Sequence, residues 1–181
     1  MLAHQGGSNL CDTLDYARRL LASGVRVLAF DFRGNGLSQS PRRHALALGR
    51  DLAAAVAHAH DEGAEHVFLI GASMGGAAIV QNSPGLPVAG IVSLSGTRLW
   101  PGFGINEPGA RALSAPLLYI GGREDSAAPL AEARAVVRAA GSRDKRSVFY
   151  AGALHGWQLV ADTPMGPKNR ALILSWMRAR S

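Results

Sequence analysis

Short apolar runs alternate with longer stretches of helical pattern along the chain. The apolar runs are nearly continuous, which is typical of parallel strands buried on both faces. They predict strands at residues 1–4, 25–31, 66–71, 88–94, 116–121 and 146–150. Helices are expected at residues 10–23, 44–62, 74–81, 129–140 and 166–180. Because neither a repeat nor a linker-like segment interrupts this alternation, residues 1–181 are expected to form a single α/β domain, with a mostly parallel sheet flanked by helices on both faces.

The longest stretch without an expected element runs from Ser95 to Pro116. Its glycines and prolines favour a loop with at most one short helix. Trp100 and Phe103 lie in this loop, and their aromatic rings have two interpretations. They could wall a substrate pocket, or they could simply cover the core. The sequence leaves both open.

Composition narrows the classes of function. Hydrophobic residues make up 48% of the chain and charged residues 18%, as in soluble globular proteins. No apolar run approaches the roughly 18 residues that span a bilayer, and the start of the chain has no signal-peptide pattern, so we expect a cytoplasmic protein without a membrane partner. The formal net charge is +6, but the basic residues are scattered and no basic run is interleaved with aromatic residues. This distribution argues against nucleic-acid binding.

The sequence also gives no sign of a metal or a cofactor. Cys11 is the only cysteine, which excludes an intramolecular disulfide and a thiolate cluster. His58 and His60 are two positions apart, so they fall on different faces of an expected helix, where we expect both to face solvent. The spacing of these two histidines is not that of metal ligands.

Ser73 is the strongest candidate for a catalytic residue. It lies in the pentapeptide GASMG (residues 71–75), directly after one expected strand and directly before one expected helix. A serine on such a strand-to-helix turn is held in a strained conformation that exposes its hydroxyl, and flanking glycines remove the Cβ atoms that would clash. This context predicts a nucleophile. The alternative is an ordinary glycine-rich turn.

A serine nucleophile needs a base and a carboxylate that orients the base. His155 follows the last expected strand and precedes Gly156, so its loop can bring the imidazole over the carboxyl edge of the sheet. Asp125 lies in a loop after another strand and is the expected acid, with Glu124 as the alternative. Asp125 could instead be a carboxylate at the N-terminus of the helix expected at 129–140.

The order Ser73, Asp125, His155, with each residue after a separate strand, resembles the triad of the α/β-hydrolase family. Other segments are similar to motifs of the same family in the same order. They are HQGG (residues 4–7), like the oxyanion loop; DFRGNGLS (31–38), like the D-x-R-G-x-G-x-S segment; GASMG (71–75), like the nucleophile elbow; GRED (122–125), like the acid loop; and His155-Gly156, like the histidine loop.

The resemblance implies further site residues. It implies an oxyanion hole built from the backbone N–H of Met74 and of a residue in the His4 loop, for which we expect Gly6. Gln5 departs from the glycine usual at its position, which puts the shape of the acyl pocket in question. We expect the substrate to contact the following side chains: Gln5, Leu37, Trp100, Phe103 and Trp157.

The resemblance also bears on the completeness of the sheet. Capped members of the family insert a sizeable subdomain where this chain has only residues 95–116, so no large cap and an open site are expected. The family's first two strands would precede Met1, and we expect a truncated α/β-hydrolase fold in which the apolar strand at residues 25–31 becomes an edge. Such an edge recruits another strand or aggregates, so we expect one of three things: a start site placed too far downstream, a fragment, or a homo-oligomer that pairs this edge.

The leading hypothesis is a serine hydrolase that cleaves carboxylic esters or thioesters of small molecules through an acyl-enzyme. A cofactor-free perhydrolase, a haloperoxidase or an acyltransferase would use the same triad. A non-catalytic binding protein on the same fold is a further alternative. A dinucleotide-binding protein is disfavoured, because Gln39 stands where the third glycine of G-x-G-x-x-G would be.

Overall fold

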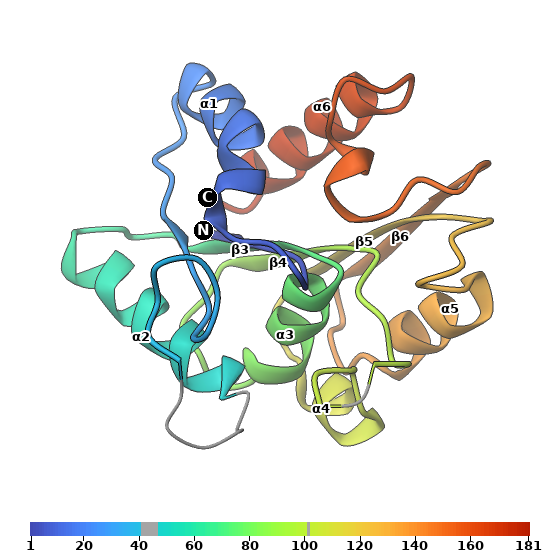
Figure 1. Cartoon of the computed structure of the whole chain (residues 1–181), viewed down its shortest axis with the longest axis horizontal. Coiled ribbons are helices and arrows are strands. Elements are labelled where there is room, and N and C mark those ends of the chain that lie inside the picture. Colours follow the sequence, from blue (N-terminus) through green and yellow to red (C-terminus); the bar gives the residue numbers. More distant parts are fainter. Residues whose placement is uncertain (41–46, 101) are drawn as a thin grey trace.

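A parallel sheet with helices on both faces forms the centre of the protein, as a computed structural model of residues 1–40, 47–100 and 102–181 shows (Figure 1). In this described part the strand order is β2-β1-β3-β4-β5-β6, and every pair is parallel. The strands are β1 (Leu2–Ala3), β2 (Ala29–Phe30), β3 (Phe68–Ala72), β4 (Gly90–Leu94), β5 (Leu117–Gly122) and β6 (Lys145–Tyr150). The helices are α1 (Leu14–Ala22), α2 (Leu48–Asp61), α3 (Met74–Asn82), α4 (Glu107–Ala112), α5 (Leu130–Ala139) and α6 (Gly166–Arg178), with 3-10 turns η1 (Leu10–Thr13) and η2 (Gly156–Leu159).

Each face of the sheet carries its own core. Along β4, Ile91 points into the core beneath α2, α3, α4 and α5, whereas its neighbour Val92 points into the core beneath α1 and α6. Leu117 and Leu118 on β5 divide between the two cores in the same way. Because successive side chains of a strand point to opposite faces, only a strand covered on both sides needs a continuous apolar run. This confirms the predicted fold class of a parallel sheet with helices on both faces.

The strand expected at residues 25–31 is much shorter in the structure, where β2 pairs over Ala29–Phe30 alone. Its partner β1 is itself only two residues long, so the ladder has few positions to fill. Before it, the backbone N–H of Val25 donates to the Leu20 carbonyl and belongs to the end of α1. The outer edge of β2 has no partner strand among the described residues, and the expected homo-oligomer stays a prediction.

Two other expectations change. The helix expected at 44–62 begins at Leu48 in the structure, and residues 44–46 lie outside the described residues. The expectation that His60 faces solvent is wrong, because its ring is half-buried between two chain segments. Its Nδ1 lies 2.7 Å from the Ala64 carbonyl oxygen and its Nε2 lies 2.8 Å from that of Pro87. The turn after α3 returns beside the end of α2, which a local helical pattern cannot reveal.

The loop after β2 is tied to its neighbours by carboxylates. Asp31 accepts hydrogen bonds from the backbone N–H of Leu10, at 2.7 Å, and of Leu37, at 3.2 Å. Asp51 on α2 pairs with the guanidinium of Arg33, at 2.6 Å from Nη2, and also accepts from the Arg33 backbone N–H. A guanidinium that donates from two of its nitrogens to one carboxylate is fixed in direction as well as in distance. The loop is therefore anchored to η1 on one side and to α2 on the other.

None of the helices in the described ranges combines the length and the apolarity that crossing a bilayer requires.

The buried strands predict a difference between two leucines. Leu117→Ala should lower the free energy of unfolding by about 2–5 kcal/mol, because the fully buried site cannot collapse around the missing atoms. Leu37→Ala, at a fully exposed position, should change it by less than about 0.5 kcal/mol. Urea denaturation of both variants measures the difference. Similar losses for the two variants would contradict the assignment of β5 to the core.

Candidate active site

Ser73 occupies a strained turn between β3 and α3. Its backbone has φ 50° and ψ −114°, a conformation that residues with a Cβ rarely adopt. The turn is fixed by hydrogen bonds on both sides, since Ser73 N donates to the Leu94 carbonyl at 2.8 Å and the Ser73 carbonyl accepts from Ala77 N at 2.8 Å. A serine at the start of a helix ordinarily caps it with its hydroxyl, but the Ser73 side chain makes no such bond. Its hydroxyl is therefore left free for other chemistry.

The glycines around Ser73 are required by close backbone contacts. A Cβ on Gly71 would lie 2.5 Å from the carbonyl carbon and oxygen of Gly75. A Cβ on Gly75 would lie 2.1 Å from the Ala3 carbonyl oxygen and 2.5 Å from that of His4. Backbone atoms cannot move away as a flexible side chain could, so any side chain here would push the turn away from β1. The glycines of the GASMG pentapeptide thus bring α3 against the loop that follows β1.

Asp125 and His155 form a hydrogen-bonded pair on two neighbouring loops. The His155 Nδ1 donates to Asp125 Oδ2 at 2.7 Å, because an ionised carboxylate can only accept. Asp125 follows β5 and His155 follows β6. The Asp125 side chain is 2% exposed, and the His155 side chain is 25% exposed. With Nδ1 protonated, the neutral imidazole presents an unprotonated Nε2 to the partly exposed side. The pair therefore has the tautomer that a general base requires.

The other oxygen of Asp125 contacts the turn before α5. Asp125 Oδ1 accepts from the backbone N–H of Ala127, at 3.0 Å, and of Ala128, at 3.1 Å. Both donors precede Pro129, the N-cap residue of α5, so Asp125 bonds to the turn before the helix and does not cap the helix itself. These bonds coexist with the bond to His155 because they use a different oxygen. Glu124 is exposed, and its backbone N–H donates to the Gly152 carbonyl at 3.1 Å.

The environment keeps Asp125 ionised. Burial raises the pKa of its carboxyl group, but the hydrogen bond from His155, the influence of the Ser95 hydroxyl, the charge of His155 and the backbone N–H of Ala128 together lower the pKa below its ordinary value. The charged form therefore stabilises the fold above the unfolded pKa of about 3.9, and this contribution is lost as the pH falls through the lower folded value. Asp125 is a permanent negative charge in the pH range in which histidines titrate.

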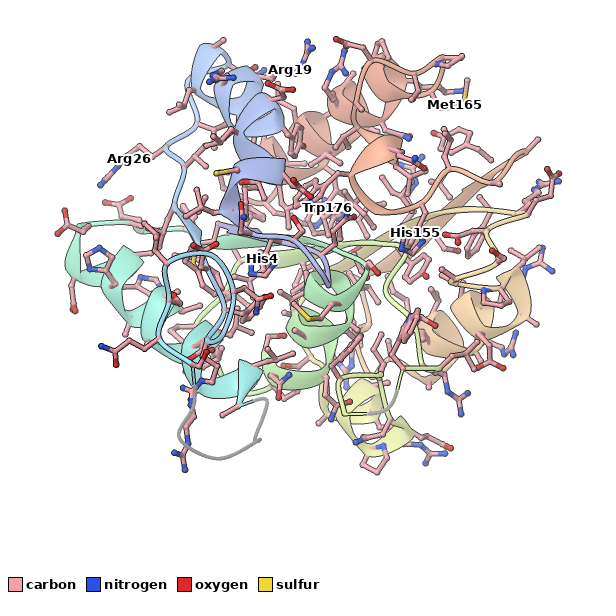
Figure 2. The ribbon with its side chains drawn as sticks, viewed as in Figure 1. His4, Arg19, Arg26, His155, Met165 and Trp176 are labelled. Carbon is pink, nitrogen blue, oxygen red and sulfur yellow. The ribbon has the colours of Figure 1, made fainter. Side chains whose placement is uncertain are left out.

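The histidine loop lies directly beside the serine turn. A Cβ on Gly156 would lie 3.4 Å from the Cβ of Ala72, the residue before Ser73, and 2.6 Å from the side-chain oxygen of Gln5. Gly156 also has a positive φ of 54°, which favours glycine. No hydrogen bond joins Ser73 to His155 in this structure, although such bonds often form only when substrate is bound. Figure 2 shows His155 and His4 at the level of the sheet, below the layer of α1 and α6.

Gly6 and Met74 also come together. A Cβ on Gly6 would lie 3.6 Å from the Met74 Cβ, so the two backbones approach closely. His4 holds this loop in place from a fully buried position: its Nε2 accepts from the backbone N–H of Phe32 at 3.0 Å, and its Nδ1 donates to the Gln5 carbonyl at 2.8 Å. Since the Phe32 N–H can only donate, Nε2 is unprotonated and the ring is the neutral Nδ1–H tautomer.

The other expected contact residues have different surroundings in the structure. Trp157 is 8% exposed and packs against Tyr16 in the core beneath α1, with ring centroids 6.0 Å apart. Leu37 is fully exposed on the loop after β2. Trp100 and Phe103 stack on each other and line a cavity of about 510 Å³ together with Gln81 and Asn82, at the opposite end of α3 from Ser73. Gln5 lies against Gly156 of the histidine loop.

Sequence reasoning missed one residue of the site, Ser95. It directly follows β4 and is among the groups that lower the pKa of Asp125. Its position after a parallel strand was the available signal, the same one that identified Asp125. Within the described ranges, no group of three or more His, Cys, Asp or Glu side chains is arranged to hold a metal ion.

Comparison with known proteins identifies the family to which the chain is similar. The sequence profile of the alpha/beta hydrolase family matches residues 2–180. Among solved structures, a monoacylglycerol lipase from Paleococcus ferrophilus superposes with a TM-score of 0.79 and 19% identity, covering 99% of this chain and 93% of its own. An esterase from Pyrococcus furiosus gives 0.78 and 18%, covering 99% and 80%. An esterase from Thermogutta terrifontis gives 0.77 and 18%, covering 99% and 89%. No curated protein sequence matches the chain.

The close contact at Gly75 predicts a sharp difference between two glycines. Gly75→Ala should lower the free energy of unfolding by at least about 1–3 kcal/mol, because its Cβ would overlap backbone carbonyls. Gly6→Ala should change it by less than about 0.5 kcal/mol, because its Cβ would make an ordinary contact at an exposed position. Thermal and urea unfolding measure both. A Gly75→Ala protein as stable as the wild type would refute the described packing of the turn.

Proposed function

Because the chain belongs to the alpha/beta hydrolase family, we propose that it is a serine hydrolase that cleaves carboxylic esters or thioesters of small molecules through an acyl-enzyme. The hydrogen bond of 2.7 Å between His155 Nδ1 and Asp125 Oδ2 carries this proposal, because it lies on the loop that packs against the Ser73 turn. An oriented base beside a strained serine with a free hydroxyl is the arrangement that nucleophilic catalysis needs. Metal ions and cofactors take no part in this chemistry.

In the first half of the proposed reaction, His155 Nε2 takes the proton of the Ser73 hydroxyl as Oγ attacks the carbonyl carbon of the ester. The carbonyl π bond breaks and its oxygen becomes negatively charged. The protonated imidazole then gives its proton to the departing alcohol or thiol, and the acyl group stays on Ser73. Asp125 stabilises the transient imidazolium and holds its tautomer, without itself taking the proton.

The second half repeats these steps with water. His155 removes a proton from a water molecule, the resulting hydroxide attacks the acyl-enzyme, and the proton returns to Ser73 Oγ as the carboxylic acid leaves. Each step develops negative charge on the same carbonyl oxygen. Backbone N–H groups in the first turn of a helix have no partner within the helix, so the Met74 N–H is available to this oxygen. The Gly6 N–H is the second proposed donor of the oxyanion hole.

The names of the similar structures support an ester as the substrate, since they are a monoacylglycerol lipase and two esterases. The segment that would carry a cap holds only α4, which is six residues long, among its described residues. We therefore expect the site to be open, and substrates with small or extended acyl groups to reach Ser73 without the movement of a lid.

The central test is the replacement of Ser73. Ser73→Ala should lower kcat for a p-nitrophenyl ester by about 10⁶-fold, as expected for the loss of a nucleophile from an intact triad. The loss should leave the unfolding midpoint almost unchanged, because the Ser73 hydroxyl makes no structural hydrogen bond. A fluorophosphonate probe should label the wild type at Ser73 and should not label the variant. Retention of a tenth of the activity, or labelling of another residue, would disprove the assignment.

The second test separates Asp125 from Glu124, adjacent carboxylates with different surroundings. Asp125→Asn should lower kcat by about 10⁴-fold, because an amide that donates to Nδ1 stabilises the wrong tautomer. Glu124→Gln, the matched control at an exposed position, should leave kcat within about two-fold of the wild type, as substitutions away from such sites usually do. In the wild type, kcat/KM should fall on acidification as His155 becomes protonated, while Asp125 stays ionised. Steady-state kinetics across pH measure both variants. A larger loss of kcat in Glu124→Gln than in Asp125→Asn would assign the acid role to Glu124.

A further inference from the structure

Ser95 is a buried serine in a strained conformation at the carboxyl end of β4. Its side chain is completely buried, and its φ of 55° lies in the left-handed region. Ser73 is the other non-glycine residue with a positive φ in the described part of the chain. Backbone strain of this kind persists only where the surroundings fix it, and it is concentrated at functional sites. The strain at Ser73 has a function in the proposed mechanism, whereas that at Ser95 has none so far.

The backbone around Ser95 is fixed from three sides. Ser95 N donates to the Ile120 carbonyl at 2.9 Å, and the next carbonyl, that of Gly96, accepts from the Tyr119 hydroxyl at 2.7 Å. The preceding carbonyl, that of Leu94, accepts from Ser73 N. Ser95 is thus tied to the strand that leads to Asp125 and to the turn that carries the nucleophile. Its position relative to both is set by backbone bonds and not by its own side chain.

The hydroxyl of Ser95 has no hydrogen-bond acceptor in the described part of the structure. Its Oγ is buried and makes no well-formed hydrogen bond to any residue in the described ranges. A buried hydroxyl without a partner is unfavourable, so such groups are rare. The pKa of Asp125 nevertheless responds to it: burial of the carboxyl raises this pKa, whereas His155 and the Ser95 hydroxyl lower it. This influence agrees with the backbone bond from Ser95 N to Ile120 of β5, the strand that leads to Asp125.

The Asp125 carboxylate can accept one more hydrogen bond than it receives from the described residues. A carboxylate has about four positions for donors, two on each oxygen. Asp125 Oδ1 accepts two backbone N–H groups, and Oδ2 accepts the single bond from His155. One position on Oδ2 has no donor among the described residues. The Tyr119 hydroxyl, whose pKa is raised by burial and by the charge of Asp125, already donates to the Gly96 carbonyl.

We propose that Ser95 is a positioning residue whose hydroxyl donates to the open position of Asp125 Oδ2 and holds the carboxylate in the plane that faces His155. This inference rests on the proposed function, because it concerns the orientation of the base in that reaction. The bond tightens when the imidazole becomes charged and draws the carboxylate toward it, as hydrogen bonds in catalytic sites commonly do on going to the transition state. Ser95 touches neither the substrate nor the reacting atoms.

Removal of the hydroxyl has a defined electrostatic consequence. Without Ser95 as a donor, more of the negative charge on Oδ2 faces His155 Nδ1–H, and the imidazolium is stabilised relative to the neutral ring. The protonated, inactive form of the base then persists to higher pH. The carboxylate also gains freedom to rotate, so the imidazole is less often oriented toward Ser73. The first effect moves the pH profile, and the second lowers kcat without affecting substrate binding.

Three variants test this role. Ser95→Ala removes the hydroxyl and keeps the strain, Ser95→Gly removes the hydroxyl and relieves the strain, and Ser95→Cys keeps a weak donor. We expect kcat to fall by about ten-fold in both Ser95→Ala and Ser95→Gly, with KM within about two-fold and the acidic limb of kcat/KM moved to higher pH. Ser95→Cys should fall between them and the wild type. Wild-type kinetics in Ser95→Ala and Ser95→Gly, or recovery in Ser95→Gly alone, would overturn the proposal, since the second result would assign the effect to backbone strain.

A measurement without turnover separates this inference from the proposed function. The His155 Nδ1–H proton, followed by NMR across pH in the Ser73→Ala background, reports the titration of the pair whether or not any ester is hydrolysed. We expect this titration to move to higher pH when Ser95→Ala is added, and not when the exposed control Glu124→Gln is added. An unchanged titration would refute the role of Ser95. A shifted titration in a protein that hydrolyses no ester would support Ser95 and reject the hydrolase function.

Discussion

The contact on which the rest of the site depends is the approach of α3 to the loop after β1, with no side chain in between. Gly75 lies so close to the carbonyls of Ala3 and His4 that even a methyl group would overlap them. This approach is possible only if the chain reverses sharply at Ser73, which explains the positive φ there. The same approach brings Met74 next to Gly6. One close packing of backbones therefore both strains the serine and brings together the two proposed oxyanion donors.

Parallel register brings the other groups to the same place. In the sheet, Ala3 aligns with Gly71, Gly71 with Ser93, and Ser93 with Tyr119. Strands aligned in this way end at one edge, so the residues that follow them meet there, as ligand sites of parallel sheets generally do. Gly6, Ser73, Ser95, Asp125 and His155 all come shortly after a strand or lie in the loop that follows one. The topology supplies their proximity, and the loops only have to supply their orientation.

This reasoning also explains how far the sequence could predict the molecule. Continuous apolar runs predicted the central strands β3, β4 and β5, because burial on both faces leaves a strong local pattern. The proximity of Asp125 and His155 could be expected from the sequence, since Asp125 follows β5 and His155 follows the next strand, β6. Features that depend on distant partners were not accessible. The length of β2 depends on β1, the surroundings of His60 depend on the turn at Pro87, and the burial of Trp157 depends on α1.

The buried charge of Asp125 links these observations. Placing a carboxylate among apolar residues is costly unless donors compensate it. Two backbone N–H groups from the turn before α5 provide a compensation that does not change with protonation, so the charge is stable whether His155 is neutral or protonated. A donor that came only from His155 would strengthen and weaken as the imidazole gained and lost its proton. His155 lowers the pKa of Asp125 the most and the fixed backbone donors add to this effect, so the carboxylate stays ionised while the imidazolium forms beside it. The orientation of Oδ2 then becomes the remaining variable, and it is the one that the geometry around Ser95 controls.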